Sequence, residues 1–283
     1  MMNDFAIFIM VYGRPEKMWT YKSLRNQGYT GKIFLVGDDT DKTIDGYKKK
    51  YGDELIIFDK KLASTKMDSG DNTGDLRSTL FSANTIPDLA KEKGVKHFMI
   101  MCDDYTAFYH NFDENYKFKK TRVKSLDKIF EAMRTFLDKS KATTIAMSQG
   151  GDFLGGAESS NAKMKLMRKA MNTFMCSTDK PIKFVGRLNE DATTYTLLGG
   201  RGELFFTFTN VCVIQTAHQS QKSGLTDVYL DYGTYVKSFF AVMYNPSCVK
   251  IAEMGTVNKR IHHKISWNNA VPKIIDESIK KTT

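Results

Sequence analysis

The chain has 283 residues, its hydrophobic content of 41% allows a large core, and its charged fraction of 26% is typical of a globular protein. No apolar run approaches the length of a membrane-spanning helix, so we expect no membrane partner. The net charge of +10, with a pI near 9.2, favours polyanionic partners such as nucleic acid or nucleotide phosphates, against the simpler reading that the charge serves solubility.

The first half of the chain alternates predicted strands and helices: strand 5–11, helix 15–28, strand 32–39, strand 55–58, helix 76–94 and strand 97–101. FAIFIMV at 5–11 lacks a preceding basic stretch, so it is a buried strand rather than a signal peptide. With the next helix and strand it predicts a β-α-β unit. Pro87 interrupts the pattern of the second helix.

The second half is predicted as helix 125–140, strand 143–148, helix 162–175 and a β-hairpin over 203–215 that turns at Thr209-Asn210. The alternation followed by a mixed second half predicts one α/β domain of two lobes. The cysteines are widely spaced and form no Cys-x-x-Cys pair, so we expect neither structural zinc nor a disulfide framework, and a reducing, cytoplasmic compartment.

Ligands of open α/β sheets bind beyond the carboxyl ends of the strands. The segments at those ends are Tyr12-Gly13-Arg14, Gly37-Asp38-Asp39, Asp103-Asp104 and 150–156. The first turn, VYGRPEKM, has a single glycine and matches neither GxGxxG nor a Walker A loop. An ordinary dinucleotide dehydrogenase and a P-loop NTPase are therefore disfavoured.

Asp103 and Asp104 end a buried strand in a basic protein. Hard divalent ions take carboxylate oxygens and leave positions open for phosphate, so this pair is a candidate Mg²⁺ or Mn²⁺ site. The alternative is that one aspartate caps a helix and the other is solvated. His218 is a candidate third metal ligand, against a role at the surface or in packing.

A second acidic pair, Glu190 and Asp191, lies in VGRLNEDATTY. It is either a helix start, where acids are favourable, or a general base that deprotonates an acceptor hydroxyl.

Basic residues gather in three stretches that are either solvated faces or DNA-binding surfaces. Residues 115–141 hold nine Lys or Arg against three acids, and residues 259–283 hold six against two. Residues 159–178 contain no acid, and the predicted helix there presents four cations on one side: Lys163, Lys165, Arg168 and Lys169.

An apolar strand into GRP, a strand into VGDD and an apolar strand into an acidic pair together resemble a GT-A-fold nucleotide-sugar glycosyltransferase, over residues 5–215. The acidic pair takes the place of the DxD motif, with Cys102 at its first position, and Asn189-Glu190-Asp191 takes the place of an xED-type base motif. CDDYTAF and TDVYLDYGTYVKSFF are most similar to the TET/JBP-associated glycosyltransferases, known largely from phages.

This resemblance implies a GT-A-type Rossmann-like mixed sheet flanked by helices, in a single domain over 1–283. Residues 1–110 would form the nucleotide-sugar half, and residues 111–283 a mixed α+β acceptor half with a basic tail. A phage-encoded protein would work in the cytoplasm of an infected bacterium.

The resemblance also implies roles for individual residues. Tyr12, Gly13 and Arg14 would meet the nucleoside, and Asp38 and Asp39 the base or ribose. Arg77 would face the diphosphate, and Asp104 would bind the metal with help from Asp103. Asp152 would contact the sugar. The Cys102 departure leaves Asp104 as the principal metal ligand.

The implied reaction is metal-dependent transfer of a sugar from a UDP-sugar to the hydroxymethyl group of a modified pyrimidine in double-stranded DNA. The modified base expected first is 5-hydroxymethylcytosine. Asp191 would act as the base if the reaction inverts the anomeric centre. Two rival hypotheses are a GT-A enzyme acting on protein or polysaccharide and a catalytically inactive nucleic-acid-binding module, which Cys102 favours.

Overall fold

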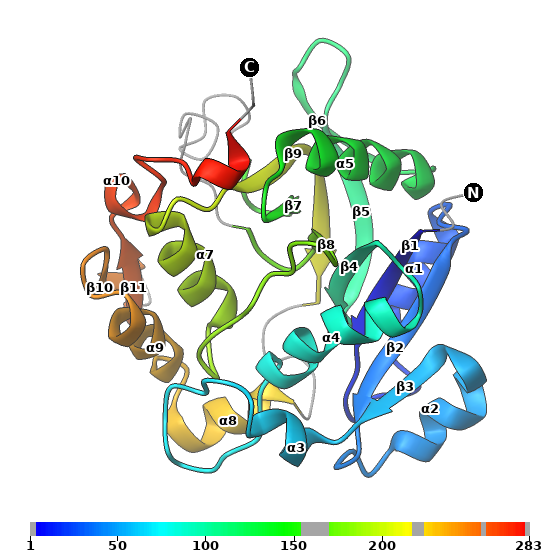
Figure 1. Ribbon diagram of the computed structural model, residues 1–283. Helices are drawn as coiled ribbons and strands as arrows, with labels where there is room; N and C mark the ends of the chain where they lie inside the picture. Colours follow the sequence, from blue (N-terminus) through cyan, green and yellow to red (C-terminus); the bar gives the residue numbers. More distant parts are fainter. Residues whose placement is uncertain (1–3, 154–169, 217–223, 256–258, 281–283) are drawn as a thin grey trace.

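A computed structural model describes residues 4–153, 170–216, 224–255 and 259–280 (Figure 1). The strands are β1 (Phe5–Met10), β2 (Lys32–Asp38), β3 (Leu55–Phe58), β4 (His97–Cys102), β5 (Tyr105–Phe112), β6 (Phe118–Arg122), β7 (Thr144–Gln149), β8 (Phe174–Ser177), β9 (Phe205–Gln215), β10 (Val249–Met254) and β11 (Arg260–Ile265). The helices are α1 (Trp19–Asn26), α2 (Ile44–Tyr51), α3 (Lys60–Ser64), α4 (Leu80–Glu92), α5 (Leu126–Ser140), α7 (Glu190–Gly200), α8 (Leu225–Tyr232), α9 (Val236–Tyr244) and α10 (Trp267–Ala270), with 3₁₀ turns at Gly52–Glu54 and Glu277–Ile279.

Nine strands form one mixed sheet in the order β3-β2-β1-β4-β8-β7-β9-β5-β6. β1 lies between β2 and β4 and is parallel to both, whereas β8 is antiparallel to β4 and to β7. The predicted β-α-β unit and the four first strands are confirmed, and so are the helices around 126–140 and 80–92, the latter with Pro87 inside it.

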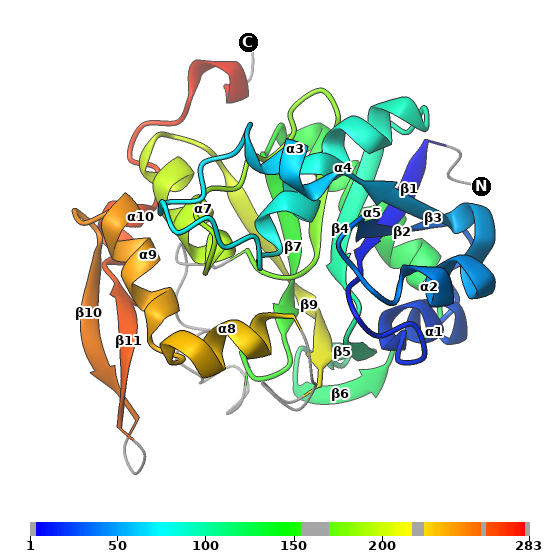
Figure 2. The same ribbon diagram turned by 90° about the horizontal axis from the view of Figure 1, so that it is seen from below.

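β1 shows why the sheet is covered on both faces. Its side chains alternate, and Phe5, Ile7 and Ile9 pack in one core with α1, α2 and α5. Ala6 and Phe8 pack in a second core on the opposite face, with α4. A strand buried on both faces has no polar side, which explains the unbroken apolar run FAIFIM and the helix layers on either side of the sheet in Figures 1 and 2.

The predicted hairpin over 203–215 is wrong, because β9 is one strand of 11 residues. Its first part pairs with β7 up to Phe208 opposite Met147, and the next β7 residue, Ser148, lies opposite Cys212. The turn-like Thr209-Asn210 is therefore accommodated as extra residues in a bulge. The Asn111 amide of β5 donates to the Thr209 carbonyl at 2.7 Å and so satisfies a backbone group that the bulge frees.

The predicted helix 162–175 is wrong over its described residues, because 170–173 are not helical and Phe174 and Met175 begin β8 beside β4. The rest of that segment up to residue 169 lies outside the described residues.

A second, two-stranded sheet forms from β10 and β11, and α9 packs on it where Ala241 of the helix meets Val249 of β10. Figures 1 and 2 both place this hairpin at the edge of the molecule opposite α2. Among the described residues, no helix has the length and apolar character needed to cross a membrane.

Candidate active site

Asp103 and Asp104 form the two-residue turn between β4 and β5. Thr20, at the start of α1, fixes this turn from both sides. Its hydroxyl donates to the Cys102 carbonyl at 2.6 Å and accepts from the Tyr105 N–H at 2.9 Å. The acidic pair is thus held at the carboxyl end of a central strand, where the sequence placed it.

The two carboxylates are buried and incompletely paired. Arg14 forms an ion pair with Asp103, in which its Nη2 lies 2.7 Å from Oδ1. Asp103 Oδ2 and Asp104 Oδ1 are buried and have no hydrogen-bond donor within the described structure. Burial raises the pKa of Asp103 to about 7 and also raises that of Asp104, while the Arg14 charge opposes both shifts. Buried carboxylate oxygens without donors are costly unless a cation meets them.

These orphaned oxygens fit a divalent cation, since carboxylates are the ligands that Mg²⁺ and Mn²⁺ prefer. The described residues contain no group of three or more His, Cys, Asp or Glu side chains placed to hold a metal. Burial raises the pKa of the Cys102 thiol well above its ordinary value, which favours the neutral thiol at the first position of the motif. His218, the predicted third ligand, lies outside the described residues.

The loop after β1 is tied to its neighbours through its backbone. The Gly13 N–H donates to Asp41 Oδ2 at 2.7 Å, and the Arg14 N–H donates to the Tyr47 hydroxyl at 2.9 Å. Gly13 has a φ of 73°, a conformation that glycine adopts at little cost. Arg14 is thereby aimed at Asp103 beside the acidic turn.

Lys60, the first residue of α3, joins the predicted nucleoside residues. Its ammonium lies 3.0 Å from Asp38 Oδ2 in a buried ion pair and 5.0 Å from the centroid of the Tyr12 ring. Asp39 is exposed and accepts from the Lys60 backbone N–H at 3.0 Å. Tyr12 and Asp38 thus meet in one polar cluster, whereas Asp39 fixes the start of α3.

Arg77 is tied to the loop before α4 and to α8. Its guanidinium donates to both carboxylate oxygens of Asp75 and lies 2.6 Å from Asp231 Oδ2. The buried Arg187 pairs with Asp71 at 2.9 Å and with Asp75 at 3.2 Å, so one network joins these elements. The diphosphate role of Arg77 remains a prediction.

Asp152 lies in the turn after β7, where its Oδ2 accepts from the Gln149 N–H at 2.8 Å. Gln149 in turn belongs to an amide cluster: the Asn172 amide nitrogen donates to Gln149 Oε1 at 2.5 Å and to Gln215 Oε1 at 3.1 Å. The Gln215 amide lies close enough to Asp104 to lower its pKa against the effect of burial. The cluster therefore extends the acidic turn towards Asp152.

Glu190 and Asp191 begin α7, as the helix-start interpretation requires. Glu190 Oε1 accepts from the Thr79 hydroxyl at 2.5 Å, and Asp191 Oδ1 accepts from the Ala192 N–H at 2.6 Å. Burial, and next the neighbouring Asp191 charge, raise the pKa of Glu190 to about 7. A raised pKa beside a second carboxylate is typical of acid–base sites, although a helix start alone also accounts for the position.

The first turn of α7 acts electrostatically on its surroundings. Burial is the main cause of the raised pKa of the Cys102 thiol, and the Glu190 charge adds to it. Burial also raises the pKa of Tyr229 in α8, to which Glu190 and Asp191 contribute, and lowers that of Lys237 in α9, which the Asp191 charge opposes. The charges of this turn therefore influence groups at the end of β4 and in the two helices α8 and α9.

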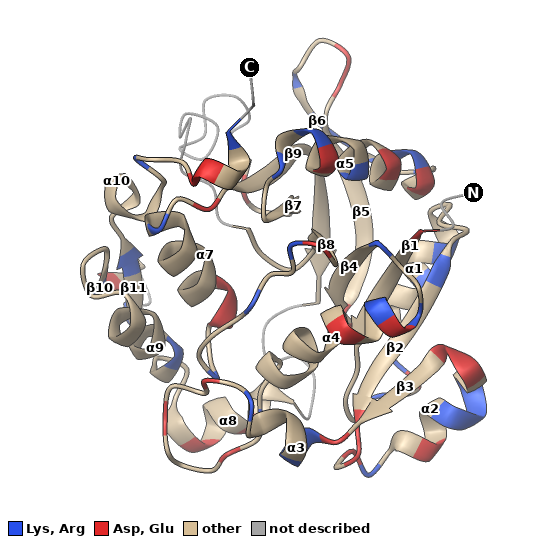
Figure 3. Cartoon of the chain, in the orientation of Figure 1, with Lys and Arg blue, Asp and Glu red and all other residues tan. Residues whose placement is uncertain are grey.

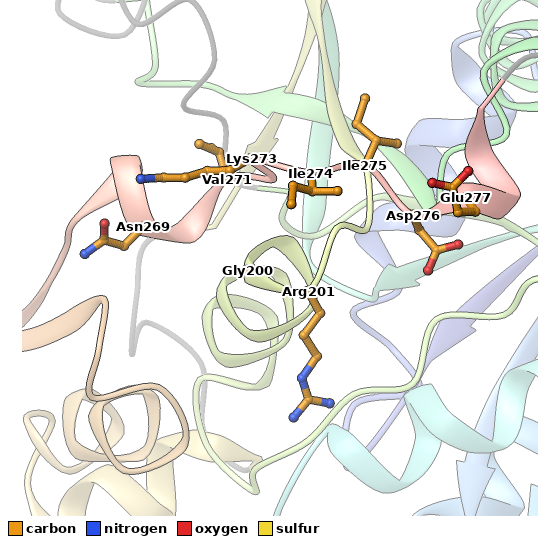
Figure 4. Close-up of a pocket in the computed structure, with 9 residues that line it drawn as sticks. All are labelled: Gly200, Arg201, Asn269, Val271, Lys273, Ile274, Ile275, Asp276 and Glu277. Atoms are coloured by element: carbon orange, nitrogen blue, oxygen red, sulfur yellow. The ribbon is translucent and has the colours of Figure 1, made fainter.

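A well-defined hollow lies elsewhere. It has a volume of about 510 Å³ and is lined by Gly200, Arg201 and the segment around 269–277 (Figure 4). It opens at the C-terminal end of α7, about 15 Å along the helix from Glu190 at a rise of about 1.5 Å per residue. Because neither acidic pair lines it, this hollow is not the candidate site.

Lys163, Lys165, Arg168 and Lys169 lie outside the described residues. Sequence reasoning missed Lys60, Asp41, Gln149 and Lys237. For Lys60 a signal existed, since it follows a predicted strand as the other site residues do. Asp41, Gln149 and Lys237 are brought to the candidate site only by contacts with residues far away in the sequence.

The model of the TET-associated glycosyltransferase family matches residues 5–224. A comparison with curated protein sequences gave no match.

Among solved structures, the fold is similar to that of a GT-A enzyme, the mannosyltransferase PcManGT from Pyrobaculum calidifontis in complex with GDP-Man and Mn²⁺, with a TM-score of 0.51 and 12% identity. That match covers 86% of this chain and 63% of the mannosyltransferase. Residues 1–349 of Staphylococcus aureus TarS in complex with UDP give a TM-score of 0.45 and 13% identity, over 75% of this chain and 60% of that TarS chain. Glucosyl-3-phosphoglycerate synthase from Mycobacterium tuberculosis has a TM-score of 0.45 and 8% identity, and the match covers 92% of this chain and 86% of the synthase. The chain thus spans less than two thirds of the length of the first two.

Proposed function

The chain belongs to the TET-associated glycosyltransferase family, and from this premise we propose that it transfers a sugar from a UDP-sugar to the hydroxymethyl group of a modified pyrimidine in DNA. The modified base proposed first is 5-hydroxymethylcytosine. The observation that carries the proposal is the buried acidic turn, whose orphaned carboxylate oxygens lie at the carboxyl end of β4.

In this proposal Asp104 and Asp103 hold Mg²⁺ or Mn²⁺, and the mannosyltransferase complex with GDP-Man and Mn²⁺ supports such a donor arrangement. When bound, the ion offsets the negative charge of the departing diphosphate. Arg14, ion-paired to Asp103, adds a fixed positive charge at the same place. The nucleoside of the donor lies against Tyr12 and Asp38, and the buried ion pair with Lys60 holds the Asp38 carboxylate in position.

Asp191 takes the proton from the acceptor hydroxyl as that oxygen bonds to the anomeric carbon and the bond to the diphosphate oxygen breaks. Two adjacent carboxylates resist simultaneous ionisation, and burial together with the Asp191 charge raises the pKa of Glu190, so the pair retains a proton more readily than an exposed carboxylate does. Asp191 is the proposed base of an inverting transfer. Asp152 and the amide cluster of Gln149 offer hydrogen bonds to the sugar hydroxyls.

The test uses the full chain with Mn²⁺, a panel of UDP-sugars and GDP-mannose, and two duplexes of one sequence, with either cytosine or 5-hydroxymethylcytosine. After digestion to nucleosides, mass spectrometry should show a hexose or pentose added only to the modified nucleoside. Donor hydrolysis without any adduct, together with transfer to a protein or polysaccharide acceptor, would refute the DNA acceptor and leave the glycosyltransferase assignment intact.

A further inference from the structure

The β10–β11 hairpin presents one strongly basic face. Opposite residues of an antiparallel pair share a face, and faces alternate along each strand. The pairs Lys250–Lys264, Ala252–His262 and Met254–Arg260 therefore lie on the same side. We call this side the basic face. Lys250, Lys264 and Arg260 are all exposed, and Figure 3 shows cations on this hairpin and at the start of α9.

The opposite side of the hairpin has a different use. Val249 is fully buried and, with its partner Ile265, packs in a small core with Ala241 of α9. The only acid of the two strands, Glu253, also lies on that side and pairs with Lys259 at 3.0 Å. The basic face thus carries no acid, while the apolar face anchors the hairpin to α9.

The basic face has an internal electrostatic conflict. Lys250 lies directly across from Lys264, and like charges in that arrangement destabilise a sheet. Within the described part of the chain, neither lysine nor Arg260 forms an ion pair with a carboxylate. Packing and hydrogen bonding of the hairpin require no cation here, so the charges point to an anion outside the chain.

The basic face is connected to the candidate active site through Lys237. This half-buried residue of α9 lies 5.5 Å from the centroid of the Tyr229 ring, and it too lacks an ion pair with a described carboxylate. Burial lowers the pKa of its ammonium, the Asp191 charge opposes this shift, and the Arg260 charge adds to it. α9 packs on both strands of the hairpin and on α7, which begins with Glu190 and Asp191, so Lys237 belongs to the helix that joins the hairpin to the proposed base.

We infer that the basic face of the β10–β11 hairpin binds the phosphate backbone of the acceptor DNA, and that Lys237 contacts the phosphate nearest the acceptor nucleotide. The inference rests on the proposed DNA acceptor. A polyanion with regularly spaced charges complements a row of cations on two strands about 4.8 Å apart. The hairpin also lies beyond residues 5–224, so this surface is not part of the region that the family model matches.

The test compares the parent with Lys250→Gln/Arg260→Gln/Lys264→Gln and with the control Lys48→Gln/Lys49→Gln/Lys50→Gln. The control removes the same charge from exposed positions of α2, on the far side of the molecule. Affinity for the hydroxymethylated duplex is measured between 0.05 and 0.3 M salt, values chosen for steep counterion release. Loss of three phosphate contacts should reduce the salt slope by up to about 2.7 and the affinity at 0.1 M salt by up to about 500-fold. The control should behave as the parent, and donor hydrolysis without DNA should be unchanged in both.

The possible results separate the two proposals. If the parent binds DNA with a steep salt response and the hairpin variant matches the control, the inference is wrong while the DNA acceptor stands. If the parent itself shows no salt-dependent DNA binding, both the inference about the hairpin and the proposed DNA acceptor are refuted. Binding to anionic lipid vesicles that depends on the hairpin, without DNA binding, would reassign the face to membranes. Should the triple variant fail to fold, each single variant makes the same test, with an expected slope change of about 0.9.

Discussion

Glu190→Gln should stabilise the protein in alkaline but not in acidic solution. Glu190 has an ordinary pKa of 4.5 and a folded-state pKa of about 7, chiefly because it is buried. Between these values the folded protein keeps a proton that the unfolded chain has released, so the free energy of unfolding falls as pH rises. The favourable contribution is complete below pH 4.5 and is lost as pH rises through 7.

The size of the effect follows from the shift. Each pKa unit corresponds to about 1.36 kcal/mol, so the full loss is about 3 kcal/mol. Between pH 5 and pH 8 the two titrations give a loss of about 2 to 3 kcal/mol. Glutamine keeps the shape and still accepts from the Thr79 hydroxyl, but it does not titrate. The stability advantage of Glu190→Gln over the parent should therefore grow by about 2 to 3 kcal/mol from pH 5 to pH 8.

Urea denaturation followed by circular dichroism at both pH values measures this difference. Titrating groups that do not interact with Glu190 are common to both proteins and cancel in the comparison, whereas the adjacent Asp191 is part of the measured effect. Glu92→Gln is the matched control, because Glu92 is exposed at the end of α4 and its replacement should give the same small change at each pH. An equal advantage of Glu190→Gln at pH 5 and pH 8 would show that Glu190 is not held protonated by its surroundings.

Three other predictions concern single positions of the site. Asp191→Asn should lower turnover by about 100-fold or more with little change in donor affinity, because a general base acts in the transition state; reduced donor affinity with normal turnover would make Asp191 a binding residue. Asp104→Asn should abolish transfer, as should EDTA, without lowering the unfolding free energy, and full activity in either case would exclude a metal role at this turn. Lys60→Met should destabilise the protein by about 3–5 kcal/mol by stranding the buried Asp38, and calorimetry of the double variant with Asp38→Asn should recover most of that loss if the ion pair is the cause.

Local sequence patterns predicted the parts of the fold that depend on the periodicity of apolar residues. The run 5–11 had to be buried on both faces, and the acidic turn had to follow a central strand, because an unbroken apolar segment fits nowhere else in an α/β sheet. The hairpin prediction failed for a different reason. Thr209-Asn210 is a real turn signal, but β9 continues past it because β7 and β5 supply partners on both sides, which no local pattern reveals.

The site shows the same division. Asp103, Asp104, Tyr12 and Asp38 follow strands and could be predicted from their position along the chain. The environment of each could not, because their partners are far away in sequence: Arg14 meets Asp103 across 89 positions, and Lys60 meets Asp38 across 22. Whether a carboxylate is paired, orphaned or protonated depends on such contacts.

The shortness of the acidic turn links the evolution of the site to that of the sheet. Its two residues join β4 and β5, which belong to the same sheet, and the pairing of β5 with β9 is already irregular between Tyr105 and Ala107. An inserted residue that neither the turn nor this irregularity absorbed would shift β5 against β9 and send every β5 side chain to the opposite face. Fully buried Phe108 would then turn to the other side of the sheet. An insertion at this turn therefore changes either the spacing of the two carboxylates or the burial of β5, whereas a substitution changes the chemistry and leaves both in place.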